Sequence, residues 1–204
     1  MRAAAESLLT PAFGLGGNEM PRPITRGRGR ATGSGVRSDH KLGSLHDLFL
    51  DELKDLYSAE QQITKALPRV VRAAASEEFK QALRHHLAET MEQVRRLEQI
   101  FESLGTSGKG KKCRGMEGVL EEGAERIEED AAPAVKDAGL ISAAQRVEHY
   151  EMAGYGSVIA YAETLGDQEA MKLLRQTLEE EKKADEVLTD LSEAINGQAG
   201  DAEA

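Results

Sequence analysis

From residue 44 onward, apolar side chains recur at alternating steps of three and four residues through four long stretches of the chain. This spacing places them on one face of an α-helix, and that face has to be buried against other helices. Aromatic residues make up 4% of the chain and Trp is absent, which argues against a β-sandwich or a β-barrel. The sequence therefore predicts an all-α fold.

Capping and helix-breaking residues divide this periodic region into separate helices. Ser44 and Ser76 are candidate N-caps, and Gly105 and Gly166 are candidate helix ends. Pro68 is expected to kink or split the first helix. Four long helices and one short helix are expected, over residues 44–75, 76–104, 116–131, 137–165 and 167–195.

The lengths of the connections predict the topology. Short turns follow the first and third long helices, whereas residues 105–136 form a long connection that carries the short helix. This pattern is typical of two antiparallel hairpins joined by a crossover, which is the ferritin-like form of the four-helix bundle. We expect the bundle over residues 44–196, a disordered basic tail over 1–43 and a frayed C-terminal tail over 197–204.

Residues 1–43 differ in composition from the rest of the chain. They contain seven basic and three acidic residues, are rich in Gly and Pro, and show no helical periodicity. Such a segment cannot bury enough apolar surface to fold. Three interpretations stay open: a passive extension or a start codon placed too far upstream, a basic arm that contacts nucleic acid, and a targeting peptide. A secretory signal is not expected, because Glu6 and Pro11 interrupt the apolar stretch.

The remainder of the chain is strongly acidic, and the whole chain has a net charge of −10. This charge argues against nucleic-acid binding through the folded body and leaves only the basic tail for such a contact. No apolar run approaches the roughly 20 residues of a membrane-spanning helix. The single cysteine, Cys113, excludes an internal disulfide framework. We expect a cytoplasmic protein that does not contact membranes.

Acidic residues interrupt the apolar stripes of three helices near their middle. They are Glu60 in the first long helix, Glu148 and Glu151 in the third, and Glu181 and Asp185 in the fourth. An ionised carboxylate in a dry core costs several kcal/mol unless it is paired. One such glutamate alone is more often solvated at a groove or bridged to a surface lysine, but here three helices share the same interruption.

The second long helix adds His86 and Glu89 at the edge of its inward face. No matching set of Lys or Arg occupies these stripe positions, so a pair of divalent cations would supply the missing positive charge. Oxygen-rich ligands of this kind suit iron or manganese. The residues expected to hold a dinuclear Fe or Mn site are Glu60, His86, Glu89, Glu148, Glu151, Glu181 and Asp185.

Four other residues are expected to be core or surface residues and not part of the metal site. Tyr155, beside the acidic band, is expected to be a core residue, with a hydrogen-bonding or redox-active phenol as the alternative. Cys113 lies in a Lys-rich loop, but a reactive thiol is less favoured than a structural one. His149 reaches a metal only if its helix is rotated, and His85 is expected at the surface. The sequence contains neither a Gly-rich phosphate loop at a helix start nor a Ser or Cys triad.

Five segments carry a resemblance to a known bacterial family: Leu56–Glu60, His86–Thr90, Cys113–Glu122, Ala144–Tyr155 and Thr177–Leu191. The most specific motifs within them are CRGMEG and VEHYE. Over about residues 44–195 the chain resembles the YciE/YciF family of ferritin-like proteins, a domain of unknown function. The basic tail falls outside this resemblance.

The resemblance implies a ferritin-like fold, a homodimer, a dinuclear metal site and an association with stress responses. It also implies that the same seven acidic and imidazole residues form the site. Better-studied ferritin-like enzymes carry Glu-x-x-His on two helices, whereas here Glu89 and Glu181 are followed three residues later by Glu92 and Ala184. This departure argues against iron oxidation of the ferritin type.

Two functions remain open at this point. The first is a ferritin-like stress-response protein that binds two Fe or Mn ions and has iron or peroxide redox activity; whether it turns over as an oxidase or in a catalase-like manner stays undecided. The alternative is a non-enzymatic helical dimer that protects or binds a partner and carries a vestigial metal site. A third idea is that the basic tail tethers the acidic body to DNA.

Overall fold

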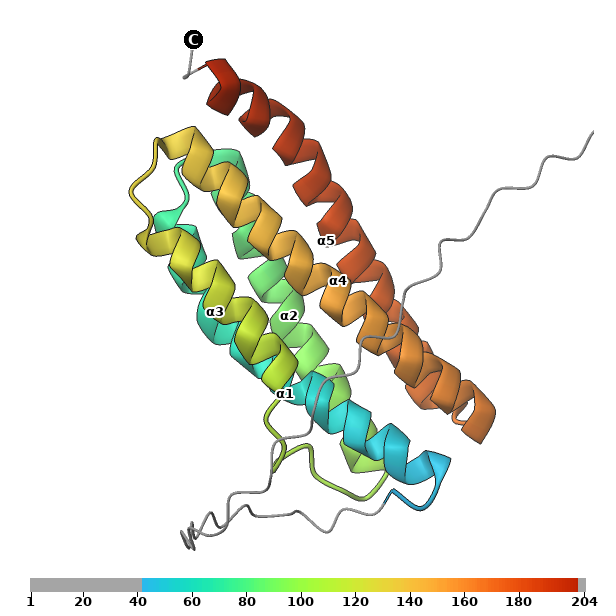
Figure 1. The fold of residues 1–204 in the computed structure, drawn as a ribbon. Helices are drawn as coiled ribbons and strands as arrows, with labels where there is room; N and C mark the ends of the chain where they lie inside the picture. The colour runs from blue at the N-terminus through green and yellow to red at the C-terminus, as the bar shows by residue number, and fades with distance from the viewer. Residues whose placement is uncertain (1–41, 202–204) are drawn as a thin grey trace, which may run out of the picture. The chain divides into compact units, whose positions relative to one another are not determined.

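The computed structural model describes residues 42–201, which form five α-helices and, within that range, no β-strand (Figure 1). This confirms the all-α prediction. No helix in this part of the chain has an apolar stretch long enough to cross a membrane. Apart from Leu42 and Gly43, the expected basic tail lies outside the described residues. The helices are α1 (Leu45–Ala73), α2 (Glu77–Ser103), α3 (Arg114–Glu128), α4 (Pro133–Leu165) and α5 (Gln168–Asp201).

The predicted caps are present at the helix starts. The Ser44 hydroxyl accepts a hydrogen bond of 3.1 Å from the backbone N–H of Asp47, and the Ser76 hydroxyl accepts one of 3.2 Å from that of Phe79. Each bond satisfies a backbone donor that the first turn of a helix leaves free. Gly166 ends α4 with a φ of 77°, a conformation that glycine adopts without steric cost.

Several helix boundaries differ from the expectation. α1 ends at Ala73 and continues through Pro68 without being split, and α3 covers Arg114–Glu128 and not 116–131. α4 begins at Pro133, four residues earlier than expected, because proline fits the first helical turn, where its missing N–H is not needed. α5 continues to Asp201 through Gly197. A helical glycine costs about 1 kcal/mol relative to Ala but, unlike proline, keeps its hydrogen-bond donor. The expected C-terminal tail is therefore helical as far as residue 201.

The long helices pack in two neighbouring pairs. α1 lies against α2 and α4 against α5, and the pairs meet through contacts of α1 with α4 and of α2 with α5. Figure 1 shows that the two helices of each pair run in opposite directions. α3, in the connection between α2 and α4, packs on α4 and α1.

A buried aspartate holds the turn between α1 and α2. Asp137 of α4 is 2% exposed, and its two carboxylate oxygens accept hydrogen bonds of 2.8 and 2.7 Å from the backbone N–H groups of Ala75 and Ser76. These donors precede α2 and have no helical partner of their own. Asp137 therefore joins the first helix pair to the second.

The apolar core consists of two clusters at opposite ends of the long helices. One cluster includes Phe49 and Leu174, and the other includes Phe79 and Leu188. The stripes are thus apolar on both sides of their acidic positions, as the sequence predicted. The charged residues between the clusters form the candidate site described below.

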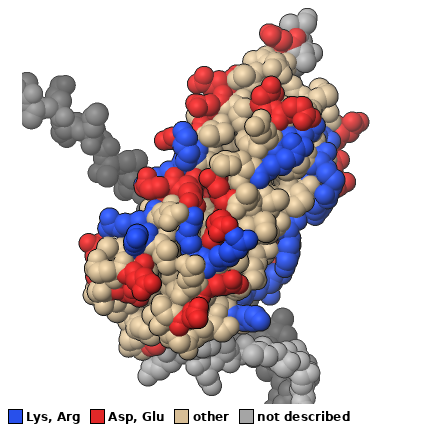
Figure 2. Space-filling model, turned by 180° about the vertical axis from the view of Figure 1, so that it is seen from behind, with Lys and Arg blue, Asp and Glu red and all other residues tan. Residues whose placement is uncertain are grey.

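Charged side chains of both signs are interspersed on the surface face shown in Figure 2. Several of them form ion pairs three residues apart on one helix, such as Glu77 with Lys80 and Glu179 with Lys182, each 2.7 Å apart. Exposed pairs of this kind contribute little to stability, typically less than about 1 kcal/mol. The interior therefore decides how the helices are held together.

Candidate metal centre

Three of the long helices bring four ionisable side chains together in the interior. They are His86 from α2, Glu148 and Glu151 from α4, and Glu181 from α5. One nitrogen or oxygen atom of each lies within 4.8 Å of those of the other three. All four are buried, and Glu151 and Glu181 are 0% exposed. We call these four residues the His86 cluster.

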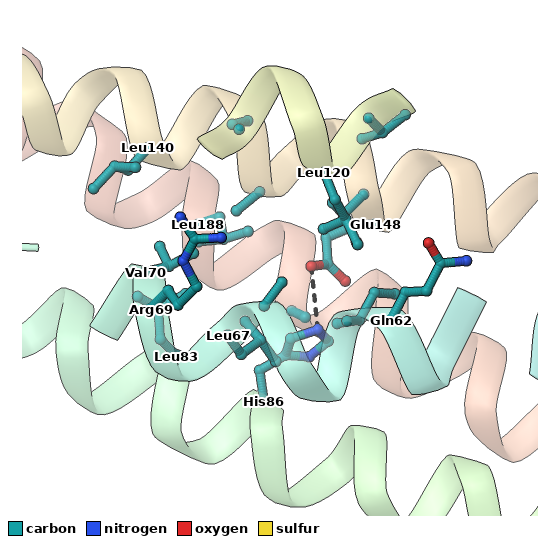
Figure 3. A pocket seen from close by; sticks show the side chains of 18 of the residues that line it. Gln62, Leu67, Arg69, Val70, Leu83, His86, Leu120, Leu140, Glu148 and Leu188 are labelled. Atoms are coloured by element: carbon teal, nitrogen blue, oxygen red, sulfur yellow. Dashed lines mark ion pairs between the residues drawn. The ribbon is translucent and has the colours of Figure 1, made fainter. Parts of the chain in front are cut away.

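The polar atoms of this cluster are largely unpaired. Both oxygens of Glu151 and of Glu181, one oxygen of Glu148 and both ring nitrogens of His86 are buried and make no hydrogen bond with any described residue. His86 Nε2 lies 3.3 Å from Glu148 Oε1 (Figure 3), which is ion-pair distance without hydrogen-bond geometry. Because buried polar groups are normally hydrogen-bonded, so many orphaned atoms in one place indicate a missing partner.

The fourth long helix contributes Glu60, which is 0% exposed. Its Oε1 accepts a hydrogen bond from the Tyr155 hydroxyl, whereas its Oε2 has no partner in the described part of the chain. Burial raises the pKa of Glu151 well above its usual range, and among the neighbouring charges the negative charge of Glu60 contributes most to this rise. Glu60 thus acts electrostatically on the cluster from α1.

Burial is the largest cause of the altered acidity of every carboxyl group here. It raises the pKa of Glu60 and Glu148 well above the usual range, with the charge of Glu181 as the next cause in both. It raises the pKa of Glu181 to about 7. Without a cation these groups therefore favour the protonated form near neutral pH, and a bound cation would reverse that preference.

The imidazole of His86 is held in its neutral form. Burial lowers its pKa to about 4, and the neighbouring charge of His85 lowers it further. A neutral imidazole has one ring nitrogen without a proton, which is the state that binds metal ions. The same burial that would destabilise a charged histidine therefore prepares His86 as a nitrogen ligand.

An arginine lies just outside the cluster. The Arg96 guanidinium of α2 donates two hydrogen bonds, of 2.5 and 2.7 Å, to the two carboxylate oxygens of Glu180 on α5. Its positive charge lowers the pKa of Glu60 and Glu181, although less than burial raises them. Because this guanidinium is already paired with Glu180, it does not neutralise the buried carboxylates.

Two predicted site residues lie apart from the cluster. The Glu89 side chain is 26% exposed and lies 3.3 Å from the ring of His85. The Asp185 side chain is 22% exposed, lies 3.3 Å from His149 Nε2 and accepts a hydrogen bond from Gln145. Of the seven predicted ligands, the structure thus brings four into one group, places Glu60 beside them, and leaves Glu89 and Asp185 at the edge.

The other candidate residues, His149, Cys113 and Tyr155, do not belong to the His86 cluster. The His149 side chain is 66% exposed and points to Asp185 at the surface. Cys113 is 0% exposed and lies 3.0 Å from the Tyr150 hydroxyl, and burial raises the pKa of its thiol. A buried thiol with a raised pKa is unreactive. Tyr155 is a core residue, as expected, and its hydroxyl bonds to Glu60.

One buried polar residue of this region was not among the predicted ligands. Gln93 is 0% exposed, its Nε2 donates to Glu180 over 3.3 Å, and its Oε1 has no partner among the described residues. It follows His86 by seven residues and therefore lies on the same helix face two turns further on. That spacing is the signal by which the sequence could have indicated it.

The donor set fits divalent metal ions. The carboxylates of Glu60, Glu148, Glu151 and Glu181 together carry the charge that two divalent cations balance, and His86 adds a neutral nitrogen. Carboxylate oxygen with one or more imidazoles suits iron and manganese, whereas thiolate sites favour softer ions. Carboxylates can also bridge two ions within a helical bundle. The arrangement is therefore chemically suited to a dinuclear site.

Comparisons with known proteins find several similar chains. Residues 44–200 match a family described as Domain of unknown function, DUF892. Protein YciF of Escherichia coli (strain K12) is 48% identical over 156 residues, which cover 76% of this chain and 93% of that protein. The crystal structure of the E. coli stress protein YciF is 46% identical and has a TM-score of 0.74, with 76% of this chain and 99% of that chain covered.

Two further solved structures resemble this chain. YcfI of Rhodopseudomonas palustris, described as a proposed structural protein, is 42% identical with a TM-score of 0.72, and the match covers 74% of this chain and 96% of that one. A protein of Xanthomonas campestris is 19% identical with a TM-score of 0.64 and covers 78% of this chain and 99% of that one. At this identity the second match supports the fold alone.

Proposed function

The chain belongs to the family described as Domain of unknown function, DUF892, in agreement with the sequence resemblance, and on this basis we propose that it is a ferritin-like stress-response protein with a dinuclear Fe or Mn site. The fold in this proposal is a four-helix bundle of two antiparallel hairpins, with α3 in the crossover. The description of the E. coli relative as a stress protein supports the stress-response part.

The orphaned atoms of the His86 cluster and of the neighbouring Glu60 carry this proposal. Together these residues bring four carboxylates and one imidazole from four helices, and most of their polar atoms have no partner among the described residues. Leaving each such atom unpaired in the interior costs on the order of 1–3 kcal/mol. Two cations would remove that cost at once, which no nearby Lys or Arg does.

Each residue has a separate task in the proposed site. Glu148, Glu151 and Glu181 would supply oxygen ligands, and His86 would supply nitrogen through whichever ring atom is unprotonated. Glu60 would bind through Oε2, because the Tyr155 hydroxyl occupies its Oε1. The two apolar clusters on either side exclude water and thereby strengthen every electrostatic contact between them.

Fe or Mn bound here would supply one-electron redox chemistry toward dioxygen or peroxide. The protein would contribute a fixed set of ligands and a dry interior around them. Glu60 and Tyr155 form a buried hydrogen-bonded pair whose proton lies between a phenol and a carboxylate. This pair would hold a proton within reach of the site without exposing the site to bulk water.

Elemental analysis of the purified, tag-free chain tests this proposal. When the cells that produce it are grown with both iron and manganese, the protein is expected to contain about two ions per chain, because two divalent cations balance the four carboxylates. Glu148→Gln and Glu181→Gln are expected to lose most of this metal. Glu163→Gln, on the exposed side of α4, is the matched control and should keep it. Metal-free protein after anaerobic loading would contradict the proposal.

The alternative function is a non-enzymatic helical protein with a vestigial site. One observation favours it: Glu89 and Asp185 are engaged by His85 and His149 near the surface, so the site has two carboxylate ligands fewer than the sequence predicted. In that case the buried carboxyl groups would remain protonated. Added Fe²⁺ or Mn²⁺ would then leave the melting temperature unchanged, whereas true site binding raises it by mass action.

The remaining expectations stay part of the proposal. They are a homodimer, a cytoplasmic location, and contact with nucleic acid only through the basic segment 1–43. Deleting residues 1–43 tests the last of these: if the segment tethers the protein to DNA, its loss should abolish any salt-sensitive DNA binding.

A further inference from the structure

A large apolar pocket opens beside the His86 cluster. It has a volume of about 500 Å³ and is lined by residues from all five helices. Its walls are mainly aliphatic, and no Phe, Tyr or Trp is among the described residues that line it. Figure 3 shows several of these side chains around His86. They include Leu67, Val70, Leu83, Leu120, Leu140 and Leu188.

Two polar residues that line the pocket are buried. They are His86 and Glu148, and both are more than nine-tenths buried. His86 Nε2 and Glu148 Oε2 have no hydrogen-bond partner in residues 42–201. Exposed charged residues of both signs, among them Lys65, Arg69 and Glu121, also line the pocket.

From this geometry we propose that the pocket binds an unbranched aliphatic molecule with a neutral oxygen end group, such as a medium-chain primary alcohol. Ligand pockets typically have volumes of about 300–1,000 Å³, mostly apolar walls and a few placed polar groups. The pocket is about three times the size of an engineered cavity of roughly 150 Å³ that holds one benzene. A chain of about ten carbons fits such a volume.

We infer the end group of the ligand from the two unpaired atoms that line the pocket, His86 Nε2 and Glu148 Oε2. An alcohol oxygen can accept a hydrogen bond from the His86 ring while its hydroxyl donates one to Glu148 Oε2. An ionised carboxylate end group would be removed from water beside His86 and Glu148, which are both uncharged in the metal-free protein, and a buried charge without a counter-charge is costly. The absence of aromatic side chains from the described lining disfavours a planar aromatic ligand, since such rings are usually bound by stacking.

The inference goes beyond the proposed function, because the apolar walls are present whether or not the cluster holds ions. The two sites share His86 and Glu148 but differ in their other residues: Glu151 and Glu181 do not line the pocket, and Ala66 lines only the pocket. Substitutions can therefore remove one site and leave the other.

Isothermal titration of the full chain, stripped of metal by a chelator, with 1-decanol as the probe tests the inference. We expect a dissociation constant in the micromolar range for 1-decanol and binding at least about tenfold weaker for decanoate. Ala66→Phe should weaken 1-decanol binding by about tenfold or more, because its ring fills the pocket. Ala88→Phe adds the same ring on the exposed face of α2 and should change binding by less than about twofold.

The controls separate the two sites. Glu151→Gln should lose metal yet keep 1-decanol binding, and Ala66→Phe should do the reverse. Should Ala66→Phe prove unfolded by circular dichroism, Ala184→Phe fills the pocket from α5 instead. No 1-decanol binding, or equal losses in Ala66→Phe and Ala88→Phe, would overturn the inference. So would a change from dimer to monomer in Ala66→Phe without ligand binding, which would show that a second copy covers the pocket.

Discussion

The Tyr155 hydroxyl donates a hydrogen bond to one carboxylate oxygen of Glu60 while the other oxygen of Glu60 has no partner among the described residues. Both side chains are 0% exposed. The tyrosine on α4 thus fixes the orientation of the glutamate on α1 and leaves one defined oxygen free. Burial, followed by the charge of Glu60, raises the pKa of the phenol well above its usual range. Tyr155 therefore remains a proton donor.

Tyr155→Phe should destabilise the metal-free protein. The substitution removes the donor and leaves a second buried oxygen of Glu60 unpaired, which costs about 1–3 kcal/mol. Denaturant unfolding of the chelator-treated protein measures this loss. Tyr161→Phe is the matched control, because Tyr161 also packs against the apolar cluster of Phe49 but makes no side-chain hydrogen bond within residues 42–201. Equal effects of the two substitutions would contradict the assigned role.

The stability of the metal-free protein should fall as the pH rises above about 6.5. The pKa of Glu181 is raised from 4.5 to about 7, so between these values the folded state binds more protons than the unfolded state and stability decreases with pH. The pKa of His86 is lowered from 6.5 to about 4, which has the opposite effect between 4 and 6.5. Above 6.5 the opposing effect of His86 ends, and the raised pKa values of Glu60, Glu148 and Glu151 extend the decrease.

Unfolding free energies at pH 6.5, 7.25 and 8 check this slope, which should be on the order of 1 kcal/mol per pH unit for each titrating group. Glu181→Gln should make the slope shallower, and Glu163→Gln should leave it as it is. Added Mn²⁺ should abolish the decrease, since metal binding favours the deprotonated carboxylates. A stability that does not change over this range would contradict the burial of ionisable carboxyl groups.

Gly115→Ala should destabilise the packing of α3 on α4. A Cβ at Gly115 would lie 2.6 Å from the ring of Tyr150, which is bonded to Asp55 and Cys113 and cannot easily move away. Such overpacking typically costs about 1–3 kcal/mol. Gly118→Ala in the same helix meets no atom within 4 Å and should stabilise the protein by about 0.5–1 kcal/mol. Thermal unfolding of both variants measures the difference, and a shift of the same sign in both would contradict this packing.

Asp137→Ala should destabilise the protein by about 2–3 kcal/mol, because it leaves the backbone N–H groups of Ala75 and Ser76 without their acceptor. Asp137→Asn keeps one acceptor oxygen and should lose less. Asp130→Ala, at an exposed position before α4, should change stability by less than about 0.5 kcal/mol. Chemical denaturation distinguishes the three. If Asp137→Ala is no worse than Asp130→Ala, the carboxylate does not hold the turn.

The helical periodicity predicted much of the site because heptad positions specify which face is buried. Glu60, Glu148, Glu151 and Glu181 occupy stripe positions, and all four are buried. His86 was expected at the edge of the inward face and is 7% exposed. The N-caps and the end of α4 followed from local residue types in the same way, since a cap depends only on nearby backbone.

The positions of Glu89 and Asp185 could not be predicted by the same argument. Each lies one turn from a buried cluster residue, where a small rotation of the helix decides between interior and surface. The Glu89 side chain pairs with His85 of the same helix, four residues earlier, and that of Asp185 pairs with His149 of the neighbouring helix α4. The hydrogen bonds of the Asp137 carboxylate to the turn before α2 could not be predicted either, because they depend on how the two helix pairs pack.

The most direct measurement of the central claim is a crystal structure of the Mn²⁺-loaded protein with anomalous-difference maps at the manganese edge. The proposed site predicts two interior peaks, ligated by Glu60, Glu148, Glu151 and Glu181 with His86 as the nitrogen ligand. If the maps of protein saturated with Mn²⁺ show no peak in the interior, or show peaks only at the pair of His149 and Asp185, the result would contradict a dinuclear centre in this protein.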